Sequence, residues 1–515
     1  MRSRGQKLVV VVVLVVAAGA VALVLAVRAM LGGDAVRQAI ETQASRAMGR
    51  PVRIASAVPR LFPRASLRLA GITIGEGPDL TIEHASISTN LLGLLSRRVE
   101  EAEIGIERSR IDLQWALALF AALSDAPSGA GDAASPLPLT VVSIRRLALR
   151  DVELVSGSRS LLVDLDSTLT ERDRLEVTRL RGRSEGSDLT ATGTISSLSR
   201  RTAAFDIEAA SLDLDGLLAF LAAATPAGRE ADGAGAAQLP AALPSLNLQA
   251  DIRAAAGRAF DAPFTNLAAS CRMSGDDVRL DGLHVELFGG RFDGSVVFAG
   301  ARREPLYEWK GTLEGMDAAA LAAFAGAGGS LTGRLGGTVS FSATGADPLA
   351  AVRRARGTAR IAVTDGRMPG LEIVRPAILA FGHPTGERPA GSGEAFTRLA
   401  ATLGVANQTF STRDLSLASR DLDLSAAGTL ALATQAIDFT ADVVLSKELS
   451  AQSGRDLYRL ARENERVVLP VRITGTVASP SVFVDIEAAL KRALRNRAED
   501  ELKSLLDRLR GKIIR

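Results

Sequence analysis

The chain has 515 residues, more than one ordinary globular core holds, which predicts about three domains or a growing repeat array. Its 61 basic and 58 acidic side chains give a formal net charge of +3, so no charge excess indicates a nucleic-acid partner. Hydrophobic residues reach 47% with only 4% aromatic, while one Cys and three His exclude an internal disulfide and leave little for a metal or cofactor site.

The N-terminus carries a long apolar run. Residues 8–27 hold no charged side chain, and a helix of about 20 residues spans about 30 Å, the hydrocarbon thickness of a bilayer. A cleaved signal peptide is the competing interpretation. Its apolar region is about 7–15 residues long and ends at a small-x-small site, whereas Arg28, Ala29 and Met30 follow here. The sequence therefore predicts one transmembrane helix.

Basic residues flank this run unequally. Arg2, Arg4 and Lys7 precede it, whereas Arg28 alone follows it closely. By the positive-inside rule, residues 1–7 stay in the cytoplasm and the rest of the chain crosses the membrane. For a bacterial chain this predicts a single-pass inner-membrane protein with its bulk in the periplasm, an oxidising space with which the near-absence of Cys is compatible.

Two amphipathic helices are expected outside the membrane. Residues 34–48 form the first, which Gly49 ends, with these apolar positions on one face: Ala35, Ile40, Ala44 and Ala47. Residues 485–510 form the second, with Asp485 as N-cap and a stripe of leucines. We expect that stripe to dock on the protein, and contact with an anionic membrane surface is the alternative.

Period-2 alternation of apolar residues dominates the rest and predicts antiparallel strands with one apolar and one polar face. It is present in residues 66–74, 104–106, 111–113, 152–154, 161–169 and 246–252. The clearest alternation is C-terminal, at Leu415, Leu417, Leu422, Leu424, Leu430, Leu432, Ile437, Phe439, Val443 and Leu445. Gly, Asp and Ser turns between the segments favour antiparallel pairing over crossover helices.

Three Pro/Gly-rich segments interrupt the strands at residues 124–138, 222–244 and 383–393, and we interpret them as exposed loops or linkers. Residues 180–221, 283–324 and 415–449 repeat one pattern, a hairpin followed by a short helix. One such unit cannot bury its apolar face alone, so neighbouring units must stack.

For each candidate catalytic or metal-binding motif, a purely structural role explains the residues better. The G-x-S-x-G pattern at residues 182–186 lacks the helix that a nucleophile elbow needs, so Ser184 is predicted to lie in a turn. Three carboxylate pairs could hold Ca²⁺ or divide acid and base roles, but alternation with Leu predicts solvated strand faces. The pairs are Asp164/Asp166, Asp213/Asp215 and Asp421/Asp423. Neither a metal site nor a nucleotide motif is expected, and His84, His284 and His383 lack neighbouring ligands.

One-sided strands over hundreds of residues must cover their apolar face by closing into barrels, packing as a sandwich or rolling into a groove. The scarcity of aromatic residues favours a groove. The expected fold is mainly β: a long curved antiparallel sheet rolled into an elongated groove with short peripheral helices, one N-terminal transmembrane helix and a C-terminal amphipathic helix.

Residues 49–52 (GRPV) followed by residues 61–74 (LFPRASLRLAGITI) resemble the opening of the AsmA family. Residues 357–373 and 468–490 resemble the family's carboxyl-terminal region. The organisation then expected is a tail at 1–7, the anchor at 8–27, an N-terminal AsmA-like region at 34–123 and central hairpin repeats at 139–348. A C-terminal AsmA-like β region at 350–484 and the amphipathic helix at 485–515 complete it.

This resemblance implies an inner-membrane-anchored periplasmic protein of outer-membrane biogenesis that binds or conducts phospholipid acyl chains in a hydrophobic β-groove. The ten C-terminal alternating residues named above are the candidate lining, and phospholipid and outer-membrane assembly components are the expected partners. The alternative is a scaffold for outer-membrane β-barrel proteins that acts through exposed strand edges. An anchored hydrolase using Ser184 is a remote third hypothesis, so we expect no enzyme activity.

Overall fold

The fold is described from a computed structural model of the chain. It describes residues 37–495 except 39, 43, 46–49, 61–63, 76–79, 90–97, 100, 114–139, 142–143, 172–173, 198–201, 224–246, 301–303, 346–347, 372–393, 453–457, 459–460, 464, 486, 490 and 493. The transmembrane helix predicted at residues 8–27 lies outside this part of the chain, as do the loop at 383–393 and His383. No helix in the described part is long and apolar enough to span a membrane.

The described chain is mainly β, as the alternation predicts, and 23 of its strands are assigned to one sheet. It divides into two compact units. Unit 1 comprises residues 1–283 and 298–303, and unit 2 comprises residues 284–297 and 304–515. Strands β14 (Asp277–Leu287) and β15 (Gly290–Ala299) contribute residues to both units.

Unit 1 is built from long neighbouring strands that overlap every segment predicted for this region. They are β1 (Val52–Arg60), β2 (Ala65–Ile74), β3 (Leu80–Thr89), β5 (Ala102–Asp112), β7 (Ile144–Ser156), β8 (Arg159–Glu171), β9 (Arg174–Ser184), β10 (Ser187–Ser197), β11 (Thr202–Asp213), β12 (Asn247–Ala259) and β13 (Ala262–Ser274). Two short strands, β4 (Arg98–Val99) and β6 (Thr140–Val141), pair separately.

The predicted N-terminal amphipathic helix is confirmed over its described residues, which are helical between 37 and 45. Its Ile40 is 4% exposed and joins a core made by β1, β2 and β3, against which Ala44 also packs. Side chains of the same helix cover the outer edge of β1. Ser45 Oγ accepts from Val52 N–H at 2.8 Å and Glu41 Oε1 accepts from Ile54 N–H at 2.7 Å.

The expectation of purely antiparallel pairing is wrong at two places in the main sheet. Strands β5 and β7 pair in parallel, and so do β11 and β12. Parallel neighbours need a crossover of about a dozen residues or more. The segment 124–138 and all of 222–244 except the last two residues of α5 (Leu214–Ala223) lie outside the described residues, and both fall in these connections, which are long enough to return the chain to the same end of the sheet.

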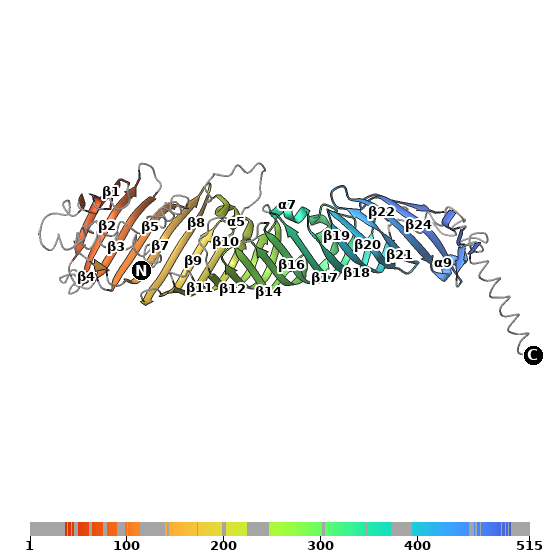
Figure 1. The fold of residues 1–515 in the computed structure, drawn as a ribbon, viewed down its shortest axis with the longest axis horizontal. Coiled ribbons are helices and arrows are strands. Elements are labelled where there is room, and N and C mark those ends of the chain that lie inside the picture. The colour runs from red at the N-terminus through yellow and green to blue at the C-terminus, as the bar shows by residue number, and fades with distance from the viewer. Residues whose placement is uncertain are drawn as a thin grey trace, which may run out of the picture. The chain divides into compact units, whose positions relative to one another are not determined.

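Unit 2 is an antiparallel series of strands that lie side by side (Figure 1). They are β16 (Leu306–Asp317), β17 (Thr332–Thr344), β18 (Arg356–Met368), β19 (Glu394–Ala406), β20 (Thr409–Ala418), β21 (Leu422–Ala431), β22 (Ala436–Leu445), β23 (Arg462–Glu463), β24 (Arg466–Thr476) and β25 (Pro480–Val484).

The predicted pattern of a hairpin followed by a short helix is confirmed in all three repeats, and each helix starts on a side-chain cap. In unit 1, Asp213 Oδ1 accepts from Gly216 N–H at the start of α5 (Leu214–Ala223). In unit 2, Asp317 caps α6 (Ala318–Phe324). Ser446 Oγ accepts from Leu449 N–H in α9 (Lys447–Gln452).

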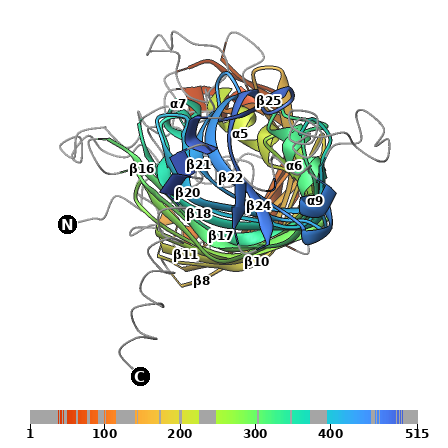
Figure 2. The ribbon, with the colours of Figure 1, turned by 90° about the vertical axis from the view of Figure 1, so that its right-hand side faces the viewer.

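The two ends of the unit 2 strands differ. Helices α6 and α9 follow the ends of β16 and β22, two strands that run in the same direction, so both lie at one end, here named the helix end. Helix α7 (Pro348–Arg353) follows β17 and lies at the opposite end, here named the α7 end. Figure 2 shows α6 and α9 on one side of the curved unit 2 strands and α7 on the other.

The C-terminal helix begins as predicted, because Asp485 Oδ1 accepts from Ala488 N–H at 2.9 Å. Arg492 holds its first turns to the sheet through Asp442 and Glu463, each at 2.7 Å. The one leucine of the predicted stripe whose side chain is described, Leu494, is 67% exposed, so this part of the helix is attached by ion pairs.

Candidate functional site: the apolar face of unit 2

Strand pairing brings the predicted lining residues together on strands β20–β22. Leu422 lies opposite Leu445, Leu424 opposite Val443, and Leu430 opposite Ile437. On the other side of β21, Leu417 lies opposite Leu424 and Leu415 opposite Ala426. In an antiparallel pair, residues directly opposite each other project to the same face. The period-2 prediction of a shared face therefore holds for these residues.

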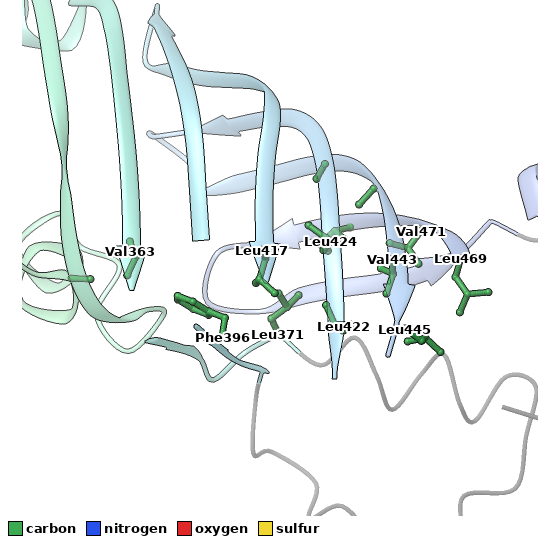
Figure 3. Close-up of a cluster of buried hydrophobic side chains, with 14 of the residues drawn as sticks. Val363, Leu371, Phe396, Leu417, Leu422, Leu424, Val443, Leu445, Leu469 and Val471 are labelled. Atoms are coloured by element: carbon green, nitrogen blue, oxygen red, sulfur yellow. The ribbon is translucent and has the colours of Figure 1, made fainter. Parts of the chain in front are cut away.

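Half of the predicted lining is sealed inside a core. Five side chains towards the helix end are at most 3% exposed: Leu417, Leu422, Leu424, Val443 and Leu445. They form one cluster with residues from β18, β19 and β24, and Figure 3 shows Leu371 and Phe396 beside Leu417. Leu449 of α9, Tyr458 and Ala461 pack against the same cluster. These five residues are structural core, which is a correction to their assignment as an accessible lining.

The other half of the predicted lining is only partly covered. Leu415, Leu430, Ile437 and Phe439 are half-buried, and the last three lie in the half of β21–β22 nearer the α7 end. Leu432 departs from the prediction. Strand β21 ends at Ala431, and Leu432 is 43% exposed in the following turn, where its N–H donates to Gln408 O.

The half-covered face continues across unit 2 through residues that the prediction did not include. Trp309 lies opposite Phe341, and Leu313 lies opposite Gly337, which pairs with Ile361. Further along, Phe410 lies opposite Leu430. All five of these apolar side chains are half-buried. The alternation at residues 307–313 was a usable signal, because Tyr307, Trp309 and Leu313 occupy odd positions of one strand.

The opposite face of the same strands is polar and exposed to solvent. Arg472 pairs with Asp438 at 3.0 Å and Arg466 with Asp423 at 2.8 Å. The hydrogen bond from Arg472 holds the pKa of Asp438 below its ordinary value. Unit 2 therefore presents a charged face on one side and an apolar face on the other. The apolar face is fully buried only towards the helix end.

Glycine and phenylalanine recur as cross-strand partners on this face. Phe439 lies opposite Gly428, and a Cβ on Gly428 would stand 2.2 Å from Asp438 O and 2.7 Å from the Phe439 ring. Phe341 stands in the same relation to Gly357. The missing Cβ lets each ring lie down against its neighbouring strand, an arrangement known to pin strand register.

The G-x-S-x-G pattern lies at a strand–turn–strand connection, with Ser184 in the strand and not in the predicted turn. Ser184 ends β9, and Glu185 and Gly186 form the turn into the antiparallel strand β10, with no helix after it. The nucleophile-elbow interpretation therefore has no structural basis.

The first carboxylate pair belongs to an ion-pair network. Asp166 receives Arg150 at 2.6 Å and Arg146 at 3.0 Å, while Asp164 receives Arg183 at 3.3 Å. Burial raises the pKa of Asp166, but the bonds from the two arginines outweigh it and hold that pKa below its ordinary value. Both carboxylates are therefore engaged within the sheet and only 16–17% exposed, which corrects the prediction that they lie on a solvated strand face.

The remaining pairs also serve the fold. Asp215 accepts from the N–H groups of Phe260 and Asp261, at 2.8 and 3.0 Å. Asp213 caps α5 and Asp423 pairs with Arg466.

Two histidines are described, and each has a charged neighbour: His84 Nδ1 lies 2.9 Å from Arg108, and His284 Nδ1 lies 2.6 Å from Asp293. In the part of the chain that the structure describes, no group of three or more His, Cys, Asp or Glu residues could hold a metal ion.

No family model, curated protein or solved structure matches this chain. The resemblance to the AsmA family therefore stays a prediction from the sequence.

Proposed function

We propose that this protein handles phospholipid and holds the acyl chains on the apolar face of unit 2. The observation that supports the proposal is the uneven covering of that face. Its side chains are sealed at the helix end and half-covered towards the α7 end, although strand pairing makes the face continuous. Leu313, Leu415, Ile437 and Phe439 pack against the core cluster and yet stay partly accessible, and a partly accessible apolar face is a candidate surface for an apolar ligand.

The energetics suit an acyl ligand. Removing methylene groups from water contributes about 0.8 kcal/mol each, so two chains of about 15 methylenes represent roughly 24 kcal/mol. An aliphatic strand face offers that burial without directional contacts, and the ligand can slide along it. Such a function needs no nucleotide, metal or catalytic group on the chain, since burial on the apolar face supplies the binding free energy.

The site of action is part of the same proposal. The apolar run at residues 8–27 would anchor the chain in the bacterial inner membrane, with the strands in the periplasm. A role in outer-membrane biogenesis follows from the AsmA resemblance.

The test uses two neighbouring residues on opposite faces of β21. Leu430→Arg places a charge on the half-covered apolar face, whereas Thr429→Arg places the same charge on the wet face, opposite Asp438. The full chain is purified, and the lipid in its organic extract is identified and counted by mass spectrometry. We expect phospholipid with the unaltered chain and with Thr429→Arg, and a loss of at least about tenfold with Leu430→Arg.

Equal lipid content in both variants would refute the proposal, as would an unaltered chain without lipid. Leu424 is unsuitable for this test, because its side chain is 3% exposed and a charge there would disrupt the core itself.

A second candidate function, a scaffold for outer-membrane β-barrel proteins, has one supporting observation. The outer edges of the first and last described strands, β1 and β25, differ in their contacts. The edge of β1 is covered by Ser45 and Glu41, whereas β25 pairs with β24 alone among the described strands and exposes Phe483 by 60%. A strand that pairs on one side only can add a strand from a partner. Crosslinks from β25 to barrel proteins, in a chain without bound lipid, would favour this candidate.

A further inference from the structure

A run of unpaired arginines lies at the α7 end of unit 2. Between Asp347 and Asp365 the sequence holds four arginines and no acidic residue. Three of them, Arg353, Arg354 and Arg356, are exposed where α7 leads into β18. None makes an ion pair with any residue that the structure describes, and Arg354 Nε donates only to Ala350 O, at 3.3 Å.

Some other arginines of unit 2 are neutralised within the fold. Arg291 pairs with Glu314 at 2.6 Å, Arg466 with Asp423 at 2.8 Å, and Arg492 with Asp442 at 2.7 Å. Because unpaired guanidinium groups on a protein surface repel one another, three of them within four residues suit an anionic partner.

An aromatic pair lies at the same end of the strands. The rings of Tyr307 and Trp309 stack at 6.0 Å with an angle of 9° between their planes. Both are half-buried near the start of β16, and Trp309 lies opposite Phe341 near the end of β17. The chain has only two Trp and two Tyr, so this is a local enrichment in an aliphatic surface.

The basic and aromatic groups are adjacent. Gly345, which follows β17, donates its N–H to Pro305 O at 3.0 Å and so ties the end of β17 to the residue before β16. A Cβ on Gly345 would stand 2.9 Å from Arg354 Nη2, so this guanidinium lies against the turn at the end of the aromatic strands. Arg354, the amphipathic rings and the half-covered apolar face therefore lie at the same end of the strands, whereas Arg356, which precedes Gly357 in β18, projects to the opposite face of the sheet.

We infer that the α7 end of unit 2 binds the phosphate of an anionic phospholipid whose acyl chains lie on the apolar face, an inference that rests on the proposed function. Guanidinium groups bind phosphate oxygens bidentately, and Trp and Tyr suit the level where an apolar region meets a wet one. The helix end is sealed by core residues such as Leu422 and Leu445, so within unit 2 the chains enter from the α7 end.

The test measures which phospholipids the full chain carries. Arg353, Arg354 and Arg356 are replaced together by Gln, which removes three charges and keeps the length of each side chain. The purified chain is mixed with vesicles of equal parts phosphatidylglycerol and phosphatidylcholine, separated from them, and its lipid is extracted and quantified. We expect the unaltered chain to carry mainly phosphatidylglycerol and the triple variant to lose that preference by about tenfold or more, with its total lipid retained.

A matched control removes the same charge elsewhere on unit 2. Arg398, Arg413 and Arg420 are also exposed and make no ion pair with described residues, and their triple replacement by Gln should keep the preference for phosphatidylglycerol. Equal loss in both triple variants would mean that net charge alone sets the preference, and would overturn the inference.

The two proposals fail differently. If the chain carries phospholipid but the triple variant at the α7 end keeps the preference, the headgroup inference is wrong and the proposed function stands. If neither the unaltered chain nor the variants carry lipid, the proposed function is wrong and the inference falls with it.

Discussion

Truncating Leu422 and Leu430 to alanine on the same strand should give very different losses of stability. Leu422 is 1% exposed and lies opposite the fully buried Leu445, so its removal leaves a cavity as well as losing the transfer free energy. Leu→Ala at such a site costs about 3 kcal/mol. Leu430 is half-buried, and water can fill the space that it leaves, so Leu430→Ala should cost about 1 kcal/mol.

Hydrogen exchange read by mass spectrometry on peptides of β20–β22 measures both values locally. This matters because the chain has two units and a global unfolding curve need not be two-state. In delipidated protein, 3 kcal/mol corresponds to about 150-fold faster exchange and 1 kcal/mol to about fivefold. Equal acceleration by the two variants would refute the reasoning, because it would mean that the α7 end is as well covered as the helix end.

Three further predictions concern the sheet and its edge. Gly428→Val should destabilise unit 2 by at least about 2 kcal/mol, because its side chain would collide with Asp438 O and displace the Phe439 ring, and exchange of the β21–β22 amides measures this. Arg472→Gln should raise the pKa of Asp438 towards its ordinary value in an NMR titration. The stability from this pair is present above the unfolded-state pKa and lost as pH falls through the lower folded-state pKa, so the variant should lose less stability on acidification. Glu41→Ala should speed exchange of the β1 amide that it accepts from, at a cost of about 1 kcal/mol, and leave unit 2 unchanged.

The sequence predicted which residues share a face but not how well that face is covered. Alternation places Leu424 and Leu430 on the same side of one strand, and the pairing confirms it. Whether each is sealed depends on segments far away in the chain, since Leu371, Leu449 and Tyr458 pack against the core that holds Leu424. Period-2 patterns carry no information about such contacts, which is why ten equivalent candidates separate into a core and a half-covered surface.

The relative direction of neighbouring strands could not be predicted from the strand sequences, for a related reason. Turn residues between β16 and β22 predict antiparallel neighbours, and the structure agrees. At β5–β7 and β11–β12 the same alternating strands pair in parallel. The strand sequences do not differ in kind, and only the length of the connection allows the return. The lengths of the predicted loops therefore carried the information about strand direction, whereas the strand patterns did not.

The recurrence of Gly opposite Phe links the fold to the proposed ligand. The pairing occurs in both units, at Gly193 with Phe205 and at Gly257 with Phe264 in unit 1 as well as at Gly428 with Phe439 in unit 2. A ring that lies against a glycine covers the backbone without projecting far from the strand, so the surface is flatter there. Acyl chains have no directional contacts to make, and a surface of low relief lets them shift along it at little cost. The same pairing also occurs inside a core, since Phe264 is 5% exposed, so it suits a ligand face only where the ring is half-buried, as at Phe439.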